Sequence, residues 1–396
     1  MSTLDSDSVR FGLTLSGDAC TSIGDYEFDL ESKLGQGAYG AVFRGYHIGD
    51  ASLVAVKVVS SDRVKEDELE SISKAQSSCV VRLLDVLKNE NLTYIIMELC
   101  DTDLAAFLKT YGKLSEQNLT TLARCLAEGY LVLHRHGIVH RDIKPQNILL
   151  KLDQSPDLES CPTPVTVING TVQSPNTISL QQPSILAAKF ADFGCSRVKK
   201  GDDEPSNCAG TFFYMAPEVG ANLVNSQKYD EAVDMWSIGV VLFQAVTGRV
   251  PFTEQQLCRL FLRAVDQNYT AYTPPSLDET NHQLSTEYDK MQPRGPPKKG
   301  KAHHCYQQHL QIIQRLLQLD PSARLSPIQF HTFAAHDRPS TFLRCLNEGS
   351  CSSMQTTSAS MSSKKLSSSV SSVRRTASGV FSRLRDAVSG CNVRLL

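Results

Sequence analysis

The chain lacks the long apolar run that a membrane-spanning helix requires. None of its 396 residues belongs to a stretch of the roughly 18–20 consecutive apolar residues that cross a bilayer. The first 24 residues are rich in Ser, Thr and Asp and lack the apolar segment of a signal peptide. We therefore expect a cytoplasmic protein in which residues 1–24 form a flexible N-terminus.

Paired cysteines and a strong net charge are missing as well. The 12 cysteines include no C-x-x-C pair, which argues against a disulfide framework or a zinc finger and favours reduced thiols. A formal net charge of -2 gives no reason to expect a nucleic-acid partner. With 41% hydrophobic residues, the chain can still bury a sizeable core.

What the chain does contain is a dense group of charged and amide side chains at residues 140–147, which read HRDIKPQN. Phosphoryl transfer from a metal-bound nucleotide to a hydroxyl requires groups of these kinds. The Asp142 carboxylate can orient the hydroxyl and accept its proton, and Lys144 can neutralise charge on the transferred phosphoryl. The side-chain oxygen of Asn147 can bind Mg²⁺. We therefore predict Asp142 and Lys144 as catalytic residues.

A second motif supplies another metal ligand. Residues 189–194 read KFADFG and are followed by MAPE at residues 215–218, in the order expected after the first motif. The carboxylate of Asp192 is suited to bridge magnesium to the terminal phosphates. We predict Asn147 and Asp192 as the two metal ligands.

Three glycines near the start of the chain indicate a phosphate-binding hairpin. Gly35, Gly37 and Gly40 have the G-x-G-x-x-G spacing, which nucleotide-binding βαβ units also use. Here the residues after Gly40 read AVFR, a strand pattern rather than a helix pattern. The glycines allow backbone N–H groups to approach phosphates where a Cβ would clash. The next strand, at residues 53–59, is apolar except for Lys57, which needs a partner there.

These motifs together resemble the eukaryotic Ser/Thr protein kinases. The resemblance rests on the two motifs above, on GIVHRDIKPQNILL at residues 137–150, on YMAPE at residues 214–218 and on DMWSIG at residues 234–239. It implies an α+β, bilobal protein kinase fold with ATP and Mg²⁺ as cofactors. The implied domain covers residues 25–340, with a β-rich N-lobe carrying one helix at 25–100 and a mostly α-helical C-lobe at 101–340. Irregular insertions are expected at about 152–187 and 266–301.

The resemblance also implies roles for further residues. Lys57 pairs with a helix carboxylate, for which Glu68 is our choice and Glu70 the alternative, and Met97 is the gatekeeper before the adenine-binding hinge. Asp234 braces the catalytic loop, and Arg324 forms a buried ion pair with Glu218. The residues implied to bind the nucleotide are Leu34, Gly35, Gln36, Gly37, Ala38, Tyr39, Gly40, Val42, Ala55, Lys57, Glu68, Met97, Glu98, Cys100 and Leu149.

Within this superfamily the chain looks most similar to the autophagy-initiating Unc-like (ULK/ATG) kinases. That similarity implies protein substrates with Ser or Thr hydroxyls, and autophagy factors as partners. One departure is Asn207, at the position where these kinases carry an activating Thr. Two alternatives stay open: a Ser/Thr kinase of another signalling pathway, and a kinase-fold scaffold of weak activity.

The last part of the chain, residues 341–396, is a Ser-rich basic tail. The segment from Gly349 to Leu396 carries a net charge of +6. Apolar residues between Val380 and Val388 recur at helical spacing, with Arg383 and Arg385 among them. A short basic amphipathic helix that weakly contacts an acidic membrane or a partner groove is one interpretation. A disordered tail is the other.

Overall fold

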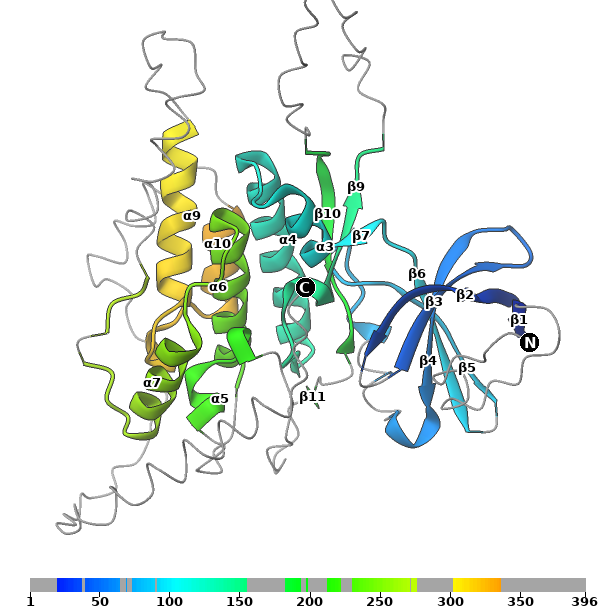
Figure 1. The fold of residues 1–396 in the computed structure, drawn as a ribbon, viewed down its shortest axis with the longest axis horizontal. Coiled ribbons are helices and arrows are strands. Elements are labelled where there is room, and N and C mark those ends of the chain that lie inside the picture. Colours follow the sequence, from blue (N-terminus) through cyan, green and yellow to red (C-terminus); the bar gives the residue numbers. More distant parts are fainter. Residues whose placement is uncertain are drawn as a thin grey trace, which may run out of the picture.

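An antiparallel six-stranded sheet forms the smaller of two lobes, at the blue end of the chain in Figure 1. In this computed structural model, the described residues are 20–37, 40–64, 69, 73–89, 91–154, 182–193, 197–198, 212–221, 230–270, 272–275 and 302–335. The strand order is β1-β2-β3-β4-β6-β5. The strands are β1 (Cys20–Ile23), β2 (Tyr26–Gly37), β3 (Gly40–His47), β4 (Leu53–Ser60), β5 (Leu83–Asn89) and β6 (Leu92–Glu98).

The two faces of strand β4 divide the small lobe between core and site. Val54, Val56 and Val58 are buried in a cluster that includes Phe28 and Ile96. Successive side chains on a strand point to opposite faces, so Ala55 and Lys57 lie on the other face of the sheet. One face of this strand therefore contributes to the core of the small lobe, and the opposite face presents Lys57.

Helices make up most of the larger lobe (Figure 1). They are α3 (Leu104–Tyr111), α4 (Glu116–Arg135), α5 (Pro217–Ala221), α6 (Ala232–Thr247), α7 (Glu254–Val265), α9 (Ala302–Leu316) and α10 (Pro327–Ala335). A large apolar cluster fills this lobe, and Trp236 and Leu122 are among its fully buried members. The bilobal α+β fold predicted from the sequence is confirmed.

Two small sheets carry the site segments of the larger lobe. One has the order β10-β9-β7, formed by Ile185–Phe190, Ile148–Leu152 and Thr102–Asp103. The other pairs β8 (Ile138–Val139) with β11 (Arg197–Val198). Short 3-10 turns lie at η1 (Ser61–Arg63), η2 (Pro145–Asn147), η4 (Phe212–Tyr214) and η5 (Pro321–Ala323). Among the described helices, none is both long enough and apolar enough to cross a membrane.

Two predicted segment boundaries are wrong by a few residues. The sequence predicts a flexible N-terminus up to residue 24, but Cys20–Ile23 form strand β1, which pairs antiparallel with β2. It predicts a first insertion up to residue 187, but β10 already begins at Ile185. Residues 1–19, 155–181, 276–301 and 336–396 lie outside the described residues, and so does the predicted basic tail.

Candidate active site

A fully buried carboxylate in helix α6 holds the catalytic loop in place. Asp234 Oδ2 accepts hydrogen bonds from His140 N at 2.6 Å and from the Tyr130 hydroxyl at 2.7 Å, and Oδ1 accepts from Arg141 N at 2.8 Å. Burial raises the pKa of Asp234, while the positive field of His140 and these hydrogen bonds oppose the rise. The structure therefore confirms the bracing role predicted for Asp234.

The side chains of Asp142, Lys144 and Asn147 form one hydrogen-bonded group. Lys144 Nζ lies 2.8 Å from Asp142 Oδ2. Asn147 Nδ2 donates to the Asp142 carbonyl oxygen at 2.8 Å and to Asp142 Oδ2 at 2.9 Å. Because these bonds use the nitrogen of the Asn147 amide, its oxygen is the atom suited to a cation. The Asp142 side chain is 10% exposed, so it is largely shielded yet accessible.

The segment that carries Asp192 is joined directly to the catalytic loop. Ala191 N donates to the Asn147 carbonyl oxygen at 2.9 Å, and His140 Nε2 lies 3.0 Å from the Ala191 carbonyl oxygen. Lys57 Nζ, from strand β4, lies 2.6 Å from Asp192 Oδ1. The two predicted metal ligands and the strand lysine are thus brought together from three separate parts of the chain.

Several residues predicted to bind the nucleotide share one face of the six-stranded sheet. Val42 lies directly opposite Lys57, and Ala55 lies directly opposite Met97. Opposite residues of an antiparallel pair project to the same face. These four residues therefore occupy the face turned away from the small core, beside the carboxylate of Asp192.

The glycine-rich hairpin joins strands β2 and β3. Gly35 pairs with Val42, and Gly37 pairs with Gly40. A Cβ on Gly40 would lie 2.1 Å from the Val58 carbonyl oxygen, and its φ of +151° also disfavours other residues. A Cβ on Gly35 would meet nothing within 4 Å, so this backbone faces open space. Leu34 beside it is 48% exposed.

The hinge segment 98–100 follows strand β6. The Glu98 side chain lies 2.8 Å from Lys189 of β10, and Glu98 N donates to the Arg82 carbonyl oxygen at 3.0 Å. Burial raises the pKa of Cys100 to about 11. Leu149 of β9 pairs with Lys189 of β10. Its neighbour Leu150 is buried in the core of the large lobe, so the Leu149 side chain projects from the opposite face of the strand.

Three of the predicted site residues lie outside the described residues: Glu68, Ala38 and Tyr39. The alternative partner Glu70 does so too. Sequence reasoning missed Lys189 and Lys151, which contact the hinge. The available signal was a lysine in each of two otherwise apolar strands, the same signal that identified Lys57.

The site residues fit a magnesium nucleotide. Mg²⁺ prefers oxygen ligands and is usually held by one or two protein groups together with substrate phosphates. Asp192 and Asn147 offer a carboxylate and an amide oxygen, and Lys57 offers a cation for phosphates. Among the described residues, no group of three or more His, Cys, Asp or Glu side chains is placed to hold a metal by itself.

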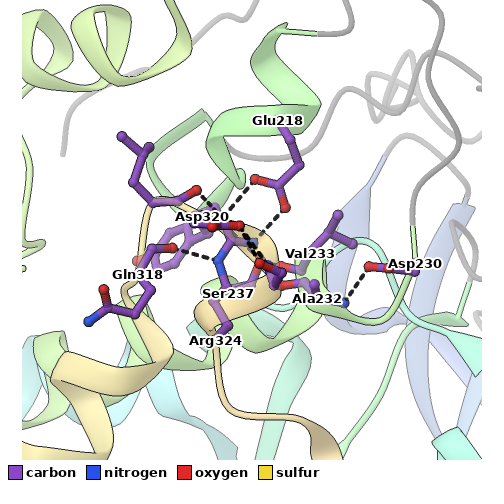
Figure 2. Close-up of polar contacts among 11 residues, drawn as sticks. Glu218, Asp230, Ala232, Val233, Ser237, Gln318, Asp320 and Arg324 are labelled. Carbon is purple, nitrogen blue, oxygen red and sulfur yellow. Dashed lines mark hydrogen bonds and ion pairs between the residues drawn. The ribbon is translucent and has the colours of Figure 1, made fainter. Parts of the chain in front are cut away.

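An arginine anchors helix α5 to the core of the large lobe. Figure 2 shows Arg324 with its guanidinium turned toward Glu218, which comes from α5. Arg324 Nη1 and Nη2 lie 2.5 and 2.8 Å from the two Glu218 carboxylate oxygens. The guanidinium also packs over the Trp236 ring, 5.0 Å from its centroid. The ion pair predicted from the sequence is confirmed.

Comparison with known proteins agrees with this geometry. The family model described as "Protein kinase domain" matches residues 28–337. Human serine/threonine-protein kinase ULK1 is 33% identical over 250 residues, which cover 61% of this chain and 21% of that protein. Arabidopsis thaliana serine/threonine-protein kinase ATG1c is 29% identical over 258 residues, which cover 62% and 30%. Xenopus laevis serine/threonine-protein kinase ULK3 is 29% identical over 313 residues, which cover 77% and 54%.

The matched segments make up between 21% and 54% of these relatives' own lengths. The similarity therefore covers only part of each relative. Within residues 28–337 of this chain, the matching family model and the arrangement of Asp142, Asn147, Asp192 and Lys57 agree. The chain belongs to the protein kinase family and is similar to the ULK and ATG1 serine/threonine kinases.

Proposed function

We propose that this protein transfers the terminal phosphoryl group of Mg-ATP to Ser or Thr hydroxyls of protein substrates. The observation that carries the proposal is a set of three contacts: Asn147 bonds the Asp142 carboxylate, the Asn147 carbonyl oxygen accepts from Ala191 N next to Asp192, and Lys57 pairs with Asp192. Members of a shared fold do not necessarily share a function, so the argument rests on this site rather than on the fold.

Each side chain has a role that its position supports. Asp142 orients the substrate hydroxyl and accepts its proton as the new bond to phosphorus forms. Lys144, 2.8 Å from that carboxylate, offsets negative charge that builds nearby. Asn147 and Asp192 would hold the metal, and Lys57 and the glycine hairpin would hold the phosphates. The bound Mg-ATP supplies the phosphoryl group and the leaving group.

The substrate class follows from the resemblance rather than from a contact. Lysine two residues after Asp142 is the form found in Ser/Thr kinases, and the relatives named above are serine/threonine kinases. We propose that autophagy factors are among the substrates and partners and that the protein acts in the cytoplasm. The alternative is a role in another signalling pathway. Identifying the phosphorylated proteins distinguishes these two possibilities.

The test is phosphoryl transfer by the purified chain. Wild-type protein and Asp142→Ala and Lys57→Met variants are incubated with γ-labelled ATP, magnesium and a generic basic protein. We expect transfer by the wild type and its loss, by at least about 10³-fold, in both variants with unchanged thermal unfolding, because positioning and charge stabilisation supply most of the rate. An exposed carboxylate, Asp266 at the end of α7, provides the control Asp266→Ala.

Undiminished transfer by either site variant would show that the assignment is wrong. Absence of transfer by the wild type, together with absence of nucleotide binding, would instead favour the scaffold alternative. A peptide array with the intact chain and with Asp142→Ala gives the preferred sequence around the modified hydroxyl. Phosphorylated autophagy factors that disappear from cells carrying only Asp142→Ala would support the proposed pathway.

A further inference from the structure

A polar junction lies on the outer side of the hinge, where strand β6 ends. Glu98 Oε1 accepts hydrogen bonds from Lys189 Nζ at 2.8 Å and from Arg82 N at 2.7 Å. Glu98 N in turn donates to the Arg82 carbonyl oxygen at 3.0 Å. The side chains of Lys189 and Glu98 are only 11% and 15% exposed. Limited contact with water makes this ion pair stronger and more demanding of its geometry than a surface pair.

The junction also holds the segment from Cys79 to Arg82 against the large lobe. Phe190 N donates to the Cys79 carbonyl oxygen at 3.0 Å, and Val81 N donates to the Phe190 carbonyl oxygen at 2.9 Å. The segment therefore lies between the end of β6 and strand β10. Lys189, the neighbour of Phe190, completes a contact between the lobes in addition to the covalent hinge.

Strand β9 binds the rest of the hinge from the same side. Lys151 Nζ lies 2.5 Å from the Leu99 carbonyl oxygen. Asp101 N donates to the Leu150 carbonyl oxygen at 3.0 Å, and Asp101 Oδ2 accepts from Leu152 N at 2.8 Å. Strands β9 and β10 of the large lobe thus hold the Glu98 side chain, the Leu99 carbonyl oxygen and the Asp101 N–H.

We propose that Lys189 and Lys151 are positioning residues that set nucleotide affinity by fixing the hinge backbone. The inference rests on the proposed function and on the adenine-binding hinge that the resemblance to Ser/Thr kinases implies. A ligand binds more tightly when its partners are already ordered, because less conformational freedom is lost on binding. Neither lysine is assigned contact with the nucleotide, so each acts through Glu98 or Leu99.

The kinetic test compares Lys189→Met and Lys151→Met with wild type. We expect KM for ATP to rise at least about fivefold in Lys189→Met, the low end of energetic coupling between linked sites. The kcat should stay within about twofold, because the Asp142 group is untouched and only binding energy is lost. Lys189→Arg keeps the positive charge and the hydrogen-bond donors, so its KM for ATP should be close to that of the wild type. Lys109→Met, at an exposed position of α3, is the matched control.

A double-variant cycle tests whether Lys189 acts through Glu98. KM for ATP of Glu98→Ala/Lys189→Met should equal that of Glu98→Ala, because the lysine has lost its acceptor. A second readout needs no nucleotide: amide hydrogen exchange at Arg82 and Glu98 should be faster in Lys189→Met than in wild type. Additive effects on KM, or unchanged exchange at both amides, would overturn the inference.

The outcomes separate this inference from the function on which it rests. Wild-type protein that binds no Mg-ATP by calorimetry would overturn both. Wild-type protein with normal transfer, beside Lys189→Met and Lys151→Met with unchanged KM, would overturn the inference alone. Should Lys189→Met fail to fold, Lys151→Met decides the question by the same measurement, because its partner is a backbone carbonyl rather than a buried charge.

Discussion

Arg324 is the residue whose bonding is most complete among those that support the site. All five N–H groups of its guanidinium have acceptors: both Glu218 oxygens and the carbonyl oxygens of Ala232, Gln318 and Leu319. Its side chain is 0% exposed and that of Glu218 is 18% exposed. A buried charge of this kind is tolerated only when it is fully paired. The loss of either Arg324 or Glu218 should therefore destabilise the folded protein.

We predict that Arg324→Ala lowers the free energy of unfolding by about 3–5 kcal/mol, because it strands the carboxylate and three carbonyl groups. Glu218→Ala should destabilise by a similar amount, because it leaves the fully buried Arg324 guanidinium without its counter-charge. Urea denaturation followed by tryptophan fluorescence measures both, since the single tryptophan lies against Arg324. Equal unfolding free energies for wild type and Arg324→Ala would contradict the prediction, and Arg259→Ala, at an exposed position on α7, serves as the control.

The difference between Arg324 and Lys189 shows which residues can be read from a sequence. Glu218, Asp142 and Asp192 lie in the motifs that carry the resemblance to Ser/Thr kinases, and the resemblance also implies that Arg324 pairs with Glu218. Lys189 also lies in a motif, but its partner Glu98 lies 91 residues away. Nothing in local periodicity joins these two positions, because the contact depends on how the lobes are placed.

At the scale of elements, helix α4 packs closely against the segment that leads from Cys79 into the small lobe. Gly129 of this helix faces that segment: a Cβ there would lie 2.7 Å from the Cys79 carbonyl oxygen and 3.0 Å from the Phe190 ring. The Cys79 carbonyl cannot turn away freely, because it accepts a hydrogen bond from Phe190 N at 3.0 Å. Glycine is required here by the close approach of backbone, not by its φ angle.

We predict that Gly129→Ala destabilises the protein although alanine is the better helix former. The gain in helix propensity is about 1 kcal/mol, whereas forcing a methyl group into a packed contact costs about 1–3 kcal/mol. The nearest atom belongs to a backbone carbonyl, so the cost should prevail and the segment from Cys79 to Arg82 should shift. Calorimetric unfolding would show a lower Tm, while Arg124→Ala, exposed on the same helix, should leave Tm nearly unchanged. A higher Tm for Gly129→Ala would contradict this reasoning.

Element boundaries are predictable where side chains signal them. Serine is a preferred N-cap residue, and the Ser115 hydroxyl accepts a hydrogen bond from Asn118 N at 3.3 Å at the start of α4. Strand β1 carries no such signal: its sequence is CTSI, and its position is set by backbone pairing with β2. Short edge strands of this kind depend on a partner strand more than on their own residues.

At the scale of the whole molecule, the site exists only because both lobes contribute to it. Lys57 and the glycine hairpin come from the small lobe, whereas Asp142, Asn147 and Asp192 come from the large lobe. The ion pair between Lys57 and Asp192 and the junction at Glu98 connect the lobes at two separate places. A bound nucleotide that contacts both lobes should therefore stabilise the entire fold rather than one half.

We predict that Mg-ATP raises the Tm of the wild type by several degrees and that removal of magnesium with EDTA reduces this shift. A ligand at 100 times its Kd adds about 2.7 kcal/mol to the free energy of unfolding, which corresponds to several degrees for a domain of this size. In Asp192→Asn, which preserves the size of the side chain but not its charge, the shift should no longer depend on magnesium. Asp266→Asn, at the exposed end of α7, should behave as wild type. A magnesium-dependent shift that survives in Asp192→Asn would mean that the metal is held elsewhere, because Asn147 alone offers only one neutral ligand.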